Sequence, residues 1–178
     1  FQFMLLPAIA RKKYKHLISL QSVFQEEAMK SDFNSFNMQA PDTSLGIIAT
    51  GLAFNYLMDV YQGQPVPHPV LKICQYPLPE RAVRELYDKC DALLVLEEGM
   101  PLVEDMIKGL AFSGSKPIKG RLDGTIDRDG ELNPNKVARA LCLTDTYGED
   151  VPAVVAARPP ALCVGCPHAD SYLALNEA

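Results

Sequence analysis

Three short apolar runs mark the middle of the chain, at residues 45–50, 70–76 and 92–96. None of them alternates strictly between apolar and polar positions, and each is followed by a stretch whose apolar residues recur at helical spacing. Strands that are apolar on both faces and alternate with helices are typical of a parallel sheet covered on both sides. The pattern therefore predicts a three-layer α/β/α fold with a mainly parallel sheet, in which these runs are neighbouring strands.

The helices predicted after these strands cover residues 52–61, 79–87 and 102–108. Residues 117–119 could add a fourth, short strand. The stretch 120–135 is rich in Gly and Asp and is predicted to be a loop, followed by a closing helix at 134–141.

The N-terminal part has a different pattern. Residues 8–30 contain few helix breakers and carry one apolar stripe, which predicts a single amphipathic helix. The stripe consists of Leu17, Leu20, Phe24 and Ala28. Residues 31–44 are rich in Ser, Asp, Asn and Pro and are interpreted as a linker, so that the compact domain begins near Leu45. The stripe needs a partner to cover it, which a second copy of the chain could provide in a homodimer.

The C-terminal part is predicted to be an extended tail. Residues 147–160 contain three prolines and are expected to form a connector. A helix is predicted to start around Asp170. Because the chain begins with Phe1 and stops inside this predicted helix, we expect it to be a fragment of a longer polypeptide.

Composition narrows the class of protein. The chain has 178 residues, of which 48% are hydrophobic and 22% charged, enough for one compact domain with extensions. Its formal net charge of −5 and single short basic run at residues 11–16 argue against nucleic-acid binding. No apolar stretch approaches the roughly 18 residues of a membrane span, and no signal peptide is recognisable. We therefore expect a cytoplasmic protein without membrane association, whose five cysteines are reduced.

The most specific chemical motif is the Cys-x-x-Cys pair formed by Cys163 and Cys166. Two thiolates at this spacing can chelate a metal ion or an iron–sulfur cluster, but such sites usually need four ligands. Only half of such a site is therefore visible in the sequence. A thioredoxin-like redox role is the alternative, although that fold requires strands after the motif.

Glu97 and Glu98 follow the third predicted strand directly. Ligands and partners meet open α/β sheets at the carboxyl edge, so these residues are candidates for an interface. Because adjacent side chains point in different directions, a shared acid/base pair is not expected, and a solvated or salt-bridged rim is favoured.

Other patterns do not form known sites. The acidic loop around Asp127 and Asp129 lacks the carboxylate that a calcium loop needs at its twelfth position, where Lys136 stands. Gly46 and Gly51 flank the first strand without the spacing of a dinucleotide or phosphate loop.

Several segments together resemble the alpha subunit of the indolepyruvate ferredoxin oxidoreductases, a family of thiamine-diphosphate enzymes. The segments are Phe3-Met4-Leu5-Leu6-Pro7-Ala8, Leu45-Gly46-Ile47-Ile48-Ala49-Thr50-Gly51, Tyr76-Pro77-Leu78-Pro79, Leu96-Glu97-Glu98, Gly130-Glu131-Leu132, and Arg158-Pro159-Pro160-Ala161-Leu162-Cys163-Val164-Gly165-Cys166-Pro167-His168. The last segment is the most specific, and it differs from the family pattern at Val164 and Ala169.

The resemblance implies a transketolase C-terminal-like α/β domain at residues 43–146. Residues 1–42 would be a helical arm from a preceding pyrimidine-binding domain, and 147–178 a connector into the thiamine-diphosphate-binding domain. The family decarboxylates aryl 2-oxo acids such as indolepyruvate oxidatively, with coenzyme A and ferredoxin. It uses thiamine diphosphate, magnesium and iron–sulfur clusters, and a beta subunit is a further partner.

By the same resemblance, Gly165, Cys166 and His168 would contribute to cofactor binding, and Cys163 and Cys166 to metal binding. The Gly-Asp-Gly motif that holds magnesium and diphosphate in this family does not occur here. We therefore expect no catalytic residue and no bound cofactor in the fragment, which would be a structural and assembly domain. The alternatives are a non-catalytic subunit-interaction module and a small Cys-x-x-Cys metal-binding protein.

Overall fold

The computed structural model describes residues 6–110, 112–144, 152–156 and 161–177. The chain divides into two compact units, within residues 1–147 and 148–178. The first unit contains the sheet and the helices around it, and the second contains one helix.

The first unit is built on a five-stranded sheet in the order β1-β3-β2-β4-β5. The strands are β1 (Ser35–Asn37), β2 (Gly46–Thr50), β3 (Val70–Ile73), β4 (Leu93–Leu96) and β5 (Ile118–Lys119). β2 pairs in parallel with both β3 and β4, β4 pairs in parallel with β5, and β1 is antiparallel to β3. The predicted neighbouring parallel strands and the short fourth strand are confirmed.

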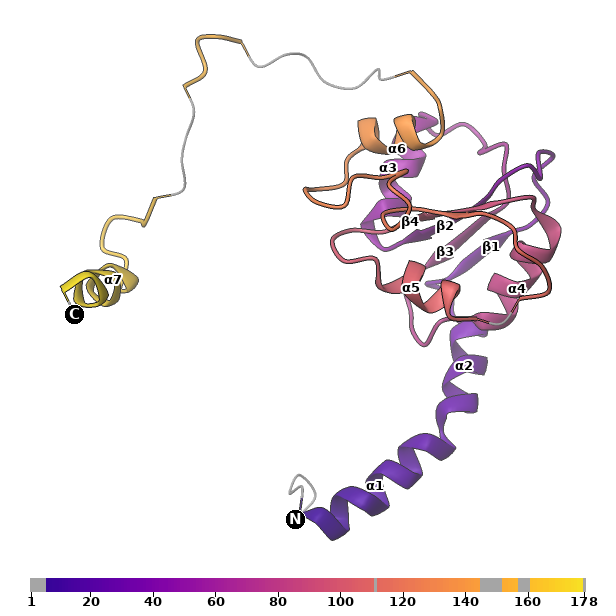
Figure 1. Cartoon of the computed structure of the whole chain (residues 1–178), viewed down its shortest axis with the longest axis horizontal. Coiled ribbons are helices and arrows are strands. Elements are labelled where there is room, and N and C mark those ends of the chain that lie inside the picture. Colours follow the sequence, from indigo (N-terminus) through magenta and orange to yellow (C-terminus); the bar gives the residue numbers. More distant parts are fainter. Residues whose placement is uncertain (1–5, 111, 145–151, 157–160, 178) are drawn as a thin grey trace. The chain divides into compact units, whose positions relative to one another are not determined.

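Helices cover both faces of this sheet (Figure 1). On one face lie α3 (Leu52–Val60) and α6 (Pro134–Ala140), and on the other lie α4 (Glu80–Lys89) and α5 (Leu102–Lys108). Successive strand residues point to opposite faces, so Ile47 packs with the first pair of helices and Ile48 with the second. Each face has its own cluster of buried apolar side chains, and the predicted three-layer α/β/α fold is confirmed.

The expectation of a linker at residues 31–44 is wrong, because this segment contains β1 and the buried residue Asn34. The Asn34 side-chain oxygen accepts the backbone N–H groups of Cys74 and Gln75 at 2.8 and 2.9 Å. Its amide nitrogen donates to the carbonyls of Ala28 at 2.8 Å and Gln75 at 3.1 Å. β3 consequently ends at Ile73, three residues before the predicted end. Polar composition conceals this strand because backbone pairing and one carboxamide hold it in place, together with the partial burial of Phe36 against the core.

The predicted single N-terminal helix is also incorrect, since two helices, α1 (Pro7–Ser19) and α2 (Gln21–Lys30), meet at Leu20. The Ser19 hydroxyl donates to the carbonyl of His16 at 2.7 Å, a bond that often accompanies a bend. The predicted stripe is buried only at its end. Ala28 is fully buried, whereas Leu17 and Phe24 are 48% and 38% exposed.

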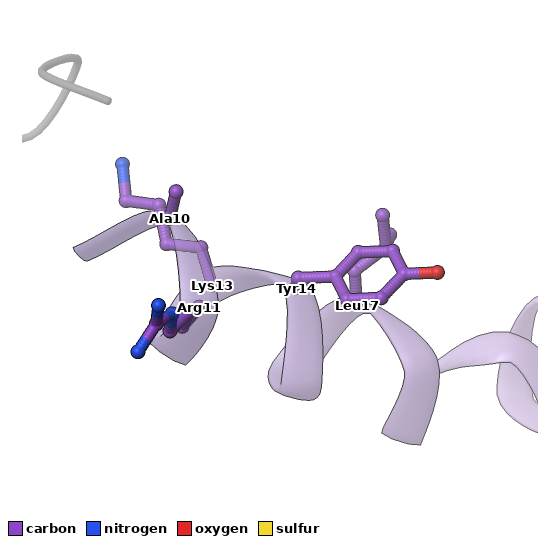
Figure 2. A pocket seen from close by; sticks show the side chains of 5 residues that line it. All are labelled: Ala10, Arg11, Lys13, Tyr14 and Leu17. Atoms are coloured by element: carbon purple, nitrogen blue, oxygen red, sulfur yellow. The ribbon is translucent and has the colours of Figure 1, made fainter. Parts of the chain in front are cut away.

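α1 buries none of its residues. Figure 2 shows the ring of Tyr14 beside the side chain of Leu17 on this helix. A shallow depression here is lined by Ala10, Arg11, Lys13, Tyr14 and Leu17. The helix therefore presents an apolar face flanked by basic side chains, as its sequence pattern predicts.

The second unit contains α7 (His168–Glu177), which starts two residues before the predicted position and buries none of its residues. Much of the predicted connector at 147–160 lies outside the described residues, as do residues 3–5 of the motif beginning at Phe3.

Candidate functional site

Glu97 lies directly after β4, at the predicted carboxyl edge of the sheet, but it is only 4% exposed. Its carboxylate oxygens each accept one backbone N–H, from Val103 and Glu104, both at 2.9 Å. These donors belong to the first turn of α5, where N–H groups have no partner within the helix. Glu97 therefore caps α5, and the expected solvated or salt-bridged rim is wrong for this residue.

Burial raises the pKa of the Glu97 carboxyl, and the nearby Glu104 carboxylate adds to that rise. The two backbone N–H groups and the Arg121 guanidinium oppose it, by stabilising the ionised form. The net direction is upward because removing the carboxylate from water outweighs the bonds that it gains.

Two further charged residues, Glu104 and Arg121, are buried beside Glu97. The Glu104 carboxylate accepts the backbone N–H of Arg121 at 2.7 Å and the Lys108 ammonium at 2.7 Å. The Arg121 guanidinium donates to the carbonyls of Glu97 at 3.1 Å and Asp127 at 2.6 Å. This network joins β4, α5 and the loop after β5.

The absence of a side chain at Gly120 allows the Glu104 carboxylate to lie close to the backbone of the loop after β5. A Cβ atom built on Gly120 would lie 2.4 Å from a Glu104 carboxylate oxygen. Any side chain at this position would push the carboxylate away from its donors. Throughout the described part of the chain, every buried side-chain nitrogen and oxygen has a hydrogen-bond partner. The network is therefore closed, and its role is to hold the loop on the sheet.

Glu98 points elsewhere, as expected for a neighbour of Glu97, and is exposed. Its carboxylate accepts the backbone N–H of Leu132 at 3.0 Å, and an ion pair of 2.9 Å joins Lys136 to Asp127 nearby. The two glutamates hold different elements, so they do not form an acid/base pair. An interface role for either residue stays a prediction.

The sequence did not identify Glu104 and Arg121 as partners of this site. A signal was available for Glu104, which stands four residues before Lys108 in a predicted helix. Arg121 lies 24 residues after Glu97 inside a loop, and no local pattern links the two.

The same edge of the sheet gathers exposed apolar side chains. Each of them stands within six residues of a strand end that lies at this edge of the sheet. They are Phe33, Leu52, Tyr76, Met100, Leu102 and Leu122, with exposed fractions between 39% and 72%. Single exposed apolar residues are ordinary, but a set from five strand ends indicates a contact surface. We call this set the carboxyl-edge face.

The predicted cysteine motif lies in the second unit. The carbonyl of Cys163 accepts the N–H of Cys166 at 3.0 Å, and Gly165 between them has a φ of +77°. This is a tight turn whose third position requires positive φ, which glycine adopts without strain. α7 follows at His168, and the Cys166 sulfur lies 3.5 Å from His168 Nδ1. The structure therefore brings Cys166 and His168 together, as two of the three predicted cofactor-binding residues.

This turn supplies only part of a metal or cofactor site. Among the described residues there is no group of three or more His, Cys, Asp and Glu side chains placed to hold a metal ion. Within residues 161–170 there is one carboxylate, that of Asp170 in the first turn of α7, to bind a magnesium ion beside a diphosphate. The residues present thus do not fit a complete thiamine-diphosphate or iron–sulfur site.

None of the helices in the described residues combines the length and the apolar character that crossing a bilayer requires.

Comparisons with known proteins identify curated relatives. The chain is 34% identical to "Indolepyruvate oxidoreductase subunit IorA" of Methanothermobacter thermautotrophicus, over 99% of this chain and 30% of that protein. It is 31% identical to the subunit of the same name from Archaeoglobus fulgidus, over 97% of this chain and 29% of that protein. The chain spans about 30% of the length of the curated relatives it matches. No family model and no solved structure matches it.

Proposed function

Because this chain belongs to the family of indolepyruvate oxidoreductase subunit IorA, we propose that it is one domain of a longer oxidoreductase subunit. The complete subunit would act on aryl 2-oxo acids such as indolepyruvate. With coenzyme A it would form an acyl-coenzyme A and carbon dioxide, and the two electrons released would pass to ferredoxin. A beta subunit would complete the enzyme, which we place in the cytoplasm.

Within that subunit, residues 43–146 would be a transketolase C-terminal-like domain. Residues 1–42 would come from a preceding pyrimidine-binding domain, and 147–178 would open the thiamine-diphosphate-binding domain. The share of each relative that the chain matches, about 30%, supports only the coarser point that the chain corresponds to part of a longer subunit.

The role of the chain itself would be structural. The closed network around Glu97, Glu104 and Arg121 supports this proposal, because its charged groups are engaged in holding helix and loop to the sheet. The carboxyl-edge face supplies what an assembly domain needs, an apolar surface available to neighbouring domains or subunits.

Cofactors would be held mainly by other parts of the complete subunit. Thiamine diphosphate, when bound, supplies the stabilisation of a carbanion, and iron–sulfur clusters supply electron transfer. Gly165, Cys166 and His168 would contribute a turn at the margin of the thiamine-diphosphate site, and magnesium would need carboxylates from elsewhere.

Aspartate substitutions on the carboxyl-edge face test the assembly role. Leu52→Asp and Leu102→Asp change side chains that are 53% and 60% exposed, so the 178-residue chain should melt at an unchanged temperature. In the full-length subunit with its partner, both substitutions should lower the melting temperature and the rate of indolepyruvate-dependent ferredoxin reduction. The reason is that a carboxylate would be buried without a partner.

Val154→Asp is the matched control, because Val154 is 90% exposed and is not one of the residues of the carboxyl-edge face. It should leave the full-length subunit unchanged. Equal melting temperatures for all these variants and the unaltered full-length subunit would contradict an assembly role for the face.

A further inference from the structure

The turn before α7 places two cysteines close together. The hydrogen bond of 3.0 Å between the Cys163 carbonyl and the Cys166 N–H closes a four-residue turn. A closed turn keeps its first and fourth Cα atoms within about 7 Å. Disulfides bridge Cα atoms that are roughly 4.4–6.8 Å apart, so the backbone needs little or no rearrangement to join these sulfurs.

The surroundings of the turn leave both thiols open to reagents. Cys163 is exposed and Cys166 is partly exposed. Val164 points fully into solvent, and Gly165 has no heavy atom within 4 Å of an added Cβ. The turn therefore has room for a small disulfide to approach either sulfur.

His168 Nδ1 lies 3.5 Å from the Cys166 sulfur, but the described residues do not complete a metal site around this pair. They contain no group of three or more His, Cys, Asp and Glu side chains placed to hold a metal ion. Cys74, Cys90 and Cys142 belong to the first unit. Of these, Cys90 is buried, and burial raises the pKa of its thiol. A pair of neighbouring, accessible thiols that the described residues do not build into such a group has the chemistry of a dithiol.

We propose that Cys163 and Cys166 form a reversible dithiol–disulfide couple that exchanges with low-molecular-weight disulfides. One cysteine thiol attacks the small disulfide, whose S–S bond breaks, and one small thiol leaves with the proton. The second cysteine then attacks the mixed disulfide, forms the Cys163–Cys166 bond and releases the second small thiol. The small disulfide is reduced by two electrons and the protein is oxidised by two.

This inference is independent of the proposed oxidoreductase function, because it uses only the turn and its two thiols. The second step is intramolecular, so the effective concentration of the resolving thiol reaches the millimolar range or higher. Exposed cysteines without such a neighbour have no second step and stop at the mixed disulfide. Cys74 and Cys142 are exposed and serve as internal controls in the same chain.

The test equilibrates the reduced 178-residue chain with mixtures of reduced and oxidised glutathione, blocks free thiols by alkylation and identifies each cysteine by peptide mass. In the unaltered chain, the peptide with Cys163 and Cys166 should lose both free thiols without carrying glutathione, while Cys74 and Cys142 carry glutathione. Cys163→Ser and Cys166→Ser should each convert the remaining cysteine into a stable glutathione adduct. Full recovery with dithiothreitol should show reversibility.

Glutathione adducts at Cys163 and Cys166 in the same proportion as at Cys74 would overturn the proposal. Tightly held zinc or iron at about one atom per chain after purification without oxygen, lost in both serine variants, would also overturn it. Such a result would show that the pair is a metal ligand set.

Discussion

Asn34 stands at the point where α2, β1 and the end of β3 meet. Replacing it with alanine removes an acceptor for two backbone N–H groups and a donor to two carbonyls. We expect Asn34→Ala to lower the free energy of unfolding by about 2–3 kcal/mol, because buried backbone groups lose their partners. Urea denaturation of the 178-residue chain measures this change.

The matched control for that variant is Asn37→Ala. Asn37 is exposed, and its side chain accepts one N–H, from Gln39 at 3.3 Å. This change should cost less than about 0.5 kcal/mol. Similar losses for both variants would show that Asn34 does not hold β1 and β3 together.

Glu97 gives a prediction for pH. Burial raises its pKa, so the folded chain holds this proton more tightly than the unfolded chain does. The stability that this proton contributes is fully present below the ordinary value of 4.5 and is lost as pH rises through the folded-state pKa. We therefore expect the free energy of unfolding of the unaltered chain to fall relative to that of Glu97→Gln as pH rises above about 4.5. Denaturation of both chains across pH measures this difference.

A difference between the two chains that is constant across this range, or that grows in favour of the unaltered chain, would contradict a raised pKa at Glu97.

At the residue scale, the sequence located Glu97 and Glu98 correctly at the end of a strand but not their partners. Their position could be predicted because they directly follow an apolar run, which is a local feature of the sequence. The bonds from Glu97 to α5 and to Arg121 depend on how the following elements pack, which no spacing in the sequence specifies.

At the scale of elements, β2, β3 and β4 were predictable because each is an apolar run buried on both faces of the sheet. β1 was not predictable by that criterion. It lies at an edge, has three residues, and its central Phe36 is only half-buried. Its place depends on pairing with β3, on Asn34 and on the partial burial of Phe36, and the first two leave no apolar pattern in the sequence.

Truncations distinguish the two parts of the N-terminal segment. Removing residues 1–19 deletes α1, which buries no residue, and should change the unfolding free energy of the chain by less than about 0.5 kcal/mol. Removing residues 1–44 also deletes Ala28, Asn34 and β1, and should cost more than about 3 kcal/mol. Chemical denaturation of both truncated chains measures these values.

Equal stability of the two truncated chains would mean that residues 20–44 form a linker after all. The shorter truncation serves as the control for the longer one.

At the scale of the whole molecule, the carboxyl-edge face could not be foreseen. Leu52 and Leu102 fit the apolar pattern of their helices. That pattern alone does not distinguish them from core residues. The parallel order of β2, β3 and β4 brings them to one edge with Tyr76, and the antiparallel pairing of β1 with β3 brings Phe33 to the same edge. The cysteine turn, in contrast, was visible in the sequence because its residues are neighbours along the chain.

The central claim is that this chain contributes structure and contact surface to an oxidoreductase subunit, and not a cofactor site of its own. Isothermal titration calorimetry of the 178-residue chain with thiamine diphosphate and Mg²⁺ tests it most directly. We predict no one-to-one complex with a Kd below about 10 μM, because the sequence contains no Gly-Asp-Gly motif to hold magnesium and diphosphate, and Asp170 is the one carboxylate directly after the turn at Cys163–His168. A one-to-one complex tighter than about 10 μM would contradict the claim and place the cofactor site within these residues.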